Sequence, residues 1–123
     1  MMRTVTVILV AGLLAVTASG QVTSVSGTWE LQMAWPETTS TGVCTFKQEG
    51  DTLSGTCGSA TERFPVMGRV ESNRLSWQVN VTQEGSTGRM EFSGELDAQG
   101  TTIRGTCNIV GANSGTFTMK RTG

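Results

Sequence analysis

The sequence predicts an all-β fold: an eight-stranded antiparallel up-and-down barrel that follows a cleaved signal peptide. Three observations support this prediction. Thr, Ser and Gly make up 47 of the 123 residues, whereas the helix formers Ala, Leu and Lys are sparse after the first twenty residues. Apolar and polar residues alternate with a period of two, as in half-buried strands. Turn residues recur about every ten to twelve positions, the spacing of short strands joined by tight connections.

The first segment, 1–20, is expected to be a signal peptide and not part of the fold. Its apolar stretch 5–16 follows a positive residue and is too short to span a membrane. Small residues allow cleavage after Ala18 or Gly20, and no nearby cysteine would carry a lipid anchor. We therefore expect the mature chain, 21–123, to be a single secreted or periplasmic domain without a membrane anchor.

The first predicted strand is Gly27–Ala34. Its alternation places Trp29, Leu31 and Met33 on one face and polar residues on the other. The following stretch, Met33–Gly42, is rich in Pro, Glu and Thr, and is expected to be the longest irregular loop of the chain.

The second and third strands, Val43–Gln48 and Thr52–Gly58, are expected to form a hairpin with a two-residue Gly-Asp turn. That register places Cys44 opposite Cys57 at a non-hydrogen-bonded position, where side chains approach most closely. In an oxidising compartment the pair would form a cross-strand disulfide. Two reduced core thiols are the alternative interpretation.

The other five strands are each defined by apolar residues at alternate positions and by turn residues between them. Pro65 has no amide donor, so the fourth strand is expected to start late or to lie beside a break. The sixth strand is preceded by a predicted loop, Gln83–Gly88. The five strands are Phe64–Val70, Leu75–Val81, Met90–Leu96, Ile103–Ile109 and Gly115–Arg121.

A closed barrel explains why every strand has one apolar face, since closure also leaves no exposed sheet edge. A two-sheet sandwich would give a similar pattern and is the alternative. Glycines on the inward faces are expected to mark bends, although space for a ligand would also explain them. These glycines are Gly55, Gly68, Gly94 and Gly105.

The composition excludes several kinds of chemistry. The chain has no histidine, which removes His-activated nucleophiles and His-ligated metal sites. Its 9 basic and 10 acidic residues are scattered, so no nucleic-acid partner is expected. Glu91 and Glu95 share an outward, solvated face, and no phosphate loop or metal-ligand spacing is present. We expect no catalytic residues, metal or cofactor, and we expect Cys107 to be a buried free thiol.

Three segments resemble the calycin group of small barrels, which includes avidins, lipocalins and fatty-acid-binding proteins. Ser26–Trp29 begins the first strand, Leu53–Thr56 closes the hairpin, and Phe117-Thr118 with Arg121 ends the chain. The layout is nearest to avidin and streptavidin. The resemblance implies that Trp29 packs beneath Arg121 in a cation–π contact that closes one end of the barrel.

The same resemblance implies a ligand pocket, but not one for biotin. Trp77 and Phe92 match aromatic positions of the avidin pocket. Biotin's ureido group needs several buried hydrogen-bond partners, and apolar replacements would leave it unpaired. We therefore expect no tight biotin binding. The replaced positions, including one wall tryptophan, are Leu31, Cys57, Cys107 and Gly115.

These observations predict an exported binding module, monomeric or weakly oligomeric with the monomer favoured, that is not an enzyme and that holds a small apolar ligand in the lumen or at the loop end. Trp35 is expected to act as a lid or a surface anchor, or to pack on the barrel end. The predicted ligand-binding residues are Leu31, Met33, Trp35, Trp77, Met90, Phe92, Cys107 and Phe117.

Two alternatives remain open at this point. A barrel filled by its own side chains would serve as a structural module or bind a protein partner. A secreted protease inhibitor would use Gln21–Ser26 as an unstructured inhibitory arm, in similarity to calycin-like metalloprotease inhibitors.

Overall fold

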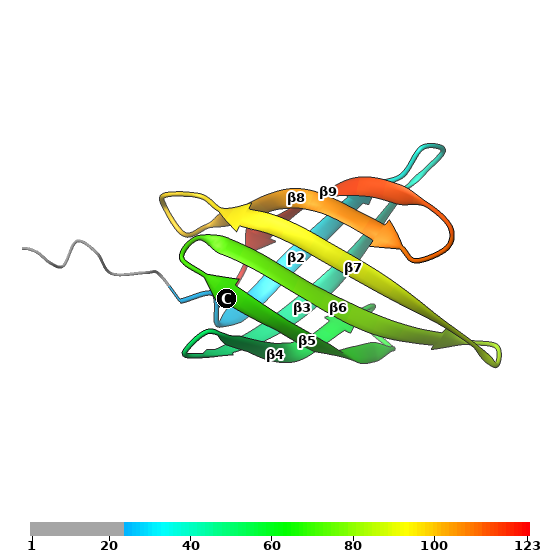
Figure 1. Cartoon of the computed structure of the whole chain (residues 1–123), viewed down its shortest axis with the longest axis horizontal. Helices are drawn as coiled ribbons and strands as arrows, with labels where there is room; N and C mark the ends of the chain where they lie inside the picture. The colour runs from blue at the N-terminus through cyan, green and yellow to red at the C-terminus, as the bar shows by residue number, and fades with distance from the viewer. Residues whose placement is uncertain (1–23) are drawn as a thin grey trace, which may run out of the picture.

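The computed structural model describes residues 24–123, so the expected signal peptide and the first part of the expected inhibitory arm lie outside the described residues. Eight antiparallel strands follow one another in sequence order, and pairing of β2 with β9 closes the barrel (Figure 1). The predicted meander barrel is confirmed, and the sandwich alternative is wrong. The strands are β2 (Gly27–Ala34), β3 (Thr39–Glu49), β4 (Thr52–Gly58), β5 (Arg63–Glu71), β6 (Arg74–Gln83), β7 (Ser86–Leu96), β8 (Thr102–Ile109) and β9 (Ser114–Arg121). Within residues 24–123 no helix is long and apolar enough to cross a membrane.

The stretch Met33–Gly42 is mostly strand, which corrects the predicted long loop. β3 starts at Thr39, opposite Ala34, and only Trp35–Thr38 connects the two strands. The amide of Trp35 donates to the carbonyl of Thr38 at 2.8 Å and closes this connection as a tight turn. The threonines that follow are β-branched and suit an extended backbone, so the strand continues where a loop was expected.

The predicted loop Gln83–Gly88 is also mostly strand. Glu84 and Gly85, with φ of 51° and 82°, form a two-residue turn of the kind that joins tight hairpins. β6 pairs with β5 only as far as Val79, and β7 pairs with β8 only from Met90. The segment Asn80–Arg89 therefore pairs with itself, apart from the hydrogen bond that the amide of Val110 donates to the carbonyl of Arg89 at 3.0 Å, and we call it the β6–β7 tip.

Pro65 lies inside β5, opposite Thr56, so the expected late start or break of this strand is wrong. β6 pairs with β5 only from Val66 onward. The first residues of β5 are therefore bordered by β4 alone, an edge setting in which a strand tolerates proline.

The β3–β4 hairpin has the predicted register. Glu49 pairs with Thr52 around the turn, and Cys44 pairs with Cys57. The two cysteines form a disulfide, with their Cα atoms 4.0 Å apart. A disulfide is consistent with an extracellular or periplasmic protein.

One end of the barrel is closed by the segment that precedes β2. Val25 is fully buried there, and its carbonyl accepts a hydrogen bond from the indole nitrogen of Trp29 at 3.0 Å. The guanidinium of Arg121 lies 4.5 Å from the centre of the Trp29 ring, which is the expected cation–π contact. It also donates to the carbonyls of Ser24, Ser26 and Gly100 at 2.7, 2.8 and 3.0 Å. We call this the closed end.

The inward glycines mark places where neighbouring strands come close. A Cβ built on Gly105 would meet the carbonyl oxygen of Ser93 and lie 2.5 Å from the Cα of Gly94. A Cβ on Gly55 would meet the carbonyl oxygen of Thr45. Backbone and not a cavity occupies this space, so these glycines serve bending and close packing.

Candidate functional site

The middle of the barrel is filled by aromatic rings. Trp77 stacks on Phe92 with ring centres 4.9 Å apart, and it meets Phe46 and Phe117 edge to face at 5.1 and 5.5 Å. All four residues are buried. The indole nitrogen of Trp77 is a buried polar atom without a hydrogen-bond partner. These rings occupy the centre of the lumen, and the open space described inside the barrel lies toward the end opposite Arg121.

We call this opposite end the mouth. Two hollows lie there, and most of the residues that line them are apolar. The inner pocket has a volume of about 180 Å³ and reaches down to Phe92. Its walls carry Leu31 and Met33 from β2, Phe64 from β5 and Met90 from β7. An apolar cavity of roughly 150 Å³ is sufficient to bind benzene. The inner pocket can therefore hold one ring or a short aliphatic chain.

A wider outer hollow of about 750 Å³ lies over the inner pocket. The two spaces share Met33, Val81 and Met90 on their walls. The β6–β7 tip contributes Val81 to this shared wall. We call the two neighbouring hollows together the funnel.

Trp35 is a fixed wall of the outer hollow. Its indole nitrogen donates to the hydroxyl of Ser40 at 2.9 Å, and its ring packs half-buried against the core. The side chain is thus held from β3 and by its own tight turn. Of the three expected roles, this geometry favours packing on the barrel end beside the hollow.

The eight predicted ligand-binding residues separate into two groups. Five of them line the inner pocket or the outer hollow, and the other three are buried outside both spaces. The sulfur of Cys107 lies 3.7 Å from the carbonyl oxygen of Thr116 in the barrel wall. The five are Leu31, Met33, Trp35, Met90 and Phe92, and the three are Trp77, Cys107 and Phe117.

Several residues of the mouth were not among those predicted for the site. Phe64, Val79, Val81 and Ile109 are apolar and inward, and strand alternation alone identifies their face. The alternation does not give the height of these residues along the barrel, because that height depends on which loops lie at the mouth. Following the predicted up-and-down strands in order from Gly27 would have shown which loops these are.

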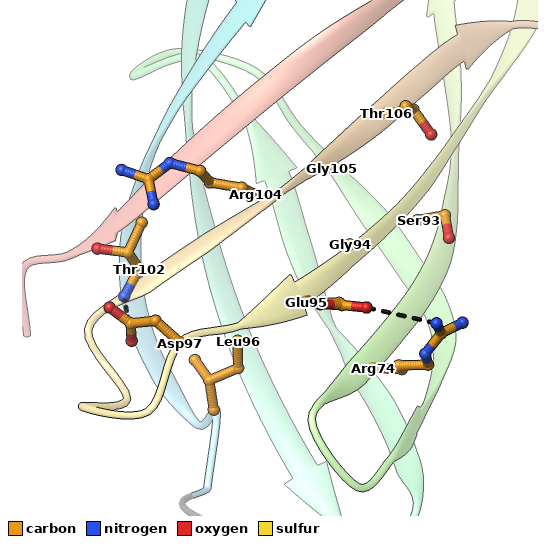
Figure 2. Close-up of a pocket in the computed structure, with 10 residues that line it drawn as sticks. All are labelled: Arg74, Ser93, Gly94, Glu95, Leu96, Asp97, Thr102, Arg104, Gly105 and Thr106. Carbon is orange, nitrogen blue, oxygen red and sulfur yellow. Dashed lines mark hydrogen bonds and ion pairs between the residues drawn. The ribbon is translucent and has the colours of Figure 1, made fainter.

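A third hollow, of about 450 Å³, lies on the outer surface of β6, β7 and β8 (Figure 2). Three of its four charged side chains have partners, and Arg104 is the fourth. Arg74 pairs with Glu95 at 3.4 Å, and Asp97 accepts hydrogen bonds from the backbone amides of Thr101 and Thr102 at 2.9 and 3.2 Å. These amides, Thr101 first, lower the pKa of Asp97 below its usual range. The side chains here hold their own loops and strands together.

The remaining candidates for chemistry have structural partners. Glu91 pairs with Arg89 at 3.4 Å on the outer face, separate from the Glu95 pair. Burial raises the pKa of the Cys107 thiol, which disfavours the reactive thiolate. Among residues 24–123 no group of three His, Cys, Asp or Glu side chains is placed to hold a metal ion.

No protein-family model matches the chain, and no curated protein matches it. The fold and the funnel at the mouth therefore carry the functional argument.

Proposed function

We propose that this chain is an exported, monomeric binding module that holds a small apolar ligand in the funnel at its mouth. The observation that carries the proposal is an apolar pocket that opens above a filled aromatic floor. A ligand placed there would cover half-buried apolar groups such as Met33, Phe64 and Met90. Removing such surface from water stabilises a complex by about 25 cal/mol per Å².

The rest of the molecule supports a binding role more than a catalytic one. The candidate carboxylates are ion-paired on the outer surface, and the free thiol is buried. Export is supported by the leader-like sequence of 1–20 and by the Cys44–Cys57 disulfide. The monomeric state is supported by the outer face, where Met67 and Val110 are the exposed large apolar side chains of the described region.

Biotin is a poor candidate for the ligand. The resemblance to avidin extends to the barrel and to the Trp29–Arg121 contact, but the inner pocket is lined by Leu31 and by the disulfide-bonded Cys57. A ureido group buried against these two side chains would lose hydrogen bonds to water that they cannot replace. The expectation of no tight biotin binding therefore remains part of this proposal.

Part of the inhibitory arm expected for a protease inhibitor is bound to the barrel. Ser24–Ser26 is not a free segment, because Val25 is buried and Arg121 holds the carbonyls on either side of it. These three residues act in closing the barrel. The proposal accordingly places recognition at the mouth.

Native mass spectrometry of the mature protein, purified from an exporting host without added ligand, tests this proposal. We expect a monomer whose native mass exceeds its denatured mass by the mass of a retained apolar adduct. In Val81→Trp the larger side chain lies on the wall that the two hollows share and occupies the space of the ligand. This variant should therefore lose the adduct. A bare monomer in every preparation would instead favour the filled barrel with a protein partner.

Val110→Trp is the matched control. Val110 is 45% exposed and lines neither of the two hollows. The control adds the same bulk to the surface and should keep the adduct. Loss of the adduct in both variants would contradict binding at the mouth.

A further inference from the structure

We infer that the ligand of the funnel carries a positive charge next to its apolar part, as in a small aromatic or aliphatic amine. This inference rests on the proposed function, since it specifies what the same site binds. It follows from the kind of charged residue that lines the two hollows.

The charged groups in both hollows are carboxylates. Glu62 is the charged residue that lines the inner pocket, and Glu84 is the one that lines the outer hollow. They come from different turns, the β4–β5 connection and the β6–β7 tip. Glu37 adds a third carboxylate on the turn that carries Trp35. Three of the four connections at the mouth therefore present a negative charge.

Within the described chain, none of these three carboxylates takes part in an ion pair. The nearest basic side chains in sequence are Arg63 and Arg89. Arg89 pairs with Glu91 at 3.4 Å. Arg63 donates to the carbonyl of Ser59 at 2.8 Å, so its positive charge stays beside the β4–β5 turn, although neither arginine lines the funnel. Three carboxylates against this one arginine leave the field at the mouth negative, which favours a cation from outside.

Trp35 adds a second attraction for a cation. The indole nitrogen donates to the hydroxyl of Ser40, and the backbone amide of Trp35 donates to the carbonyl of Thr38, so the ring is held at the wall of the outer hollow. A fixed indole attracts an ammonium group placed over its face, and the attraction grows where water is partly excluded. Glu84 and the ring act on the outer hollow, whereas Glu62 is the charged residue of an inner pocket whose lining is otherwise mostly apolar.

The two volumes divide such a ligand into two parts. The inner pocket of about 180 Å³ suits a phenyl ring or a short alkyl chain. A linker of a few atoms would then bring an ammonium group into the outer hollow, beside Glu84 and Trp35. An anionic ligand of the same shape would meet two carboxylates and would be repelled.

Three probes of matched shape test the inference: phenethylamine, phenethyl alcohol and phenylacetate. Binding is followed by NMR of the methionine methyl groups, because Met33 and Met90 lie on the shared wall. Exposed charges attract only modestly, so we expect the amine to bind about fivefold more tightly than the alcohol. Phenylacetate should bind most weakly, and added salt should reduce the differences.

The double variant Glu62→Gln, Glu84→Gln should remove the preference for the amine. Its affinity for the alcohol should stay unchanged, and that result also shows that the pocket is intact. The control Glu30→Gln, Glu71→Gln changes the net charge equally on the outer face and should keep the preference. An amine that binds no better than the alcohol overturns the charge inference while the proposed function stands. If no probe shifts the methyl signals, the proposed function fails as well.

Discussion

Arg121 shows how one side chain ties together parts of the chain that are distant in sequence. Its three hydrogen bonds connect the end of β9 with the segment before β2 and with the β7–β8 loop, and its flat guanidinium covers the Trp29 ring. The resemblance to calycins implied the ring contact, because it rests on a short motif. The hydrogen bonds to Ser24 and Ser26 could not be predicted, since nothing in the sequence shows that these residues cross the closed end.

Replacing this arginine by lysine should destabilise the barrel. Arg121→Lys keeps the charge but loses the planar fork that reaches three carbonyls at once, so we expect the free energy of unfolding to fall by about 2 kcal/mol. Denaturant unfolding measures the change. Arg104→Lys, on the exposed face of the adjacent strand β8, should shift it by less than about 0.5 kcal/mol. Equal effects of the two substitutions would show that charge alone matters at the closed end.

Cys107 should be inert in the folded protein. The side chain is buried, and burial raises the pKa of its thiol, so little thiolate forms near neutral pH. A thiol reagent should label no cysteine in the native protein and one cysteine after denaturation without reductant, since the other two are joined. Labelling of the native protein at the rate of an unfolded peptide would contradict the buried placement of Cys107.

At the scale of elements, the sequence predicts the hairpin register well and the strand lengths less well. The β3–β4 turn is short and its cysteines face each other, so local chemistry determines the pairing. The ends of β3 and β7 depend on their partners instead. Thr39 becomes strand because it lies opposite Ala34, and Ser86 because it lies opposite Gln83. Composition suggested a loop in both places, whereas cross-strand pairing extends the sheet.

The close pairing of β7 with β8 should depend on the absence of a side chain at Gly105. In Gly105→Ala the new Cβ would press on the backbone of Ser93 and Gly94, so the strands must separate. We expect a loss of about 3 kcal/mol or more in the free energy of unfolding, measured by thermal and denaturant unfolding. Gly88→Ala, where a Cβ meets nothing within 4 Å, should change it by less than about 1 kcal/mol. If both substitutions were tolerated equally, β7 and β8 would be less closely packed than described.

At the scale of the whole molecule, strand alternation gives the inner face but not how the interior is occupied. Trp77, Phe92 and Phe117 are inward on three strands, and alternation alone leaves both a filled barrel and a pocket open. The answer depends on the heights of the rings along the barrel axis. Because the three rings meet at one level, they fill the middle and leave the mouth open. The acidic character of the mouth was equally hidden, since Glu62 and Glu84 lie in separate turns.

The side of the barrel on which Gly123 lies has a practical consequence. Ser24 and Gly123 both lie at the closed end, where the amide of Thr28 donates to the carbonyl of Gly123 at 3.2 Å (Figure 1). The four turns around the funnel are at the other end of the barrel. A surface or a fused protein attached through Gly123 would therefore leave the funnel facing the solvent, so the barrel can be displayed as an oriented receptor without any change to the residues that line it.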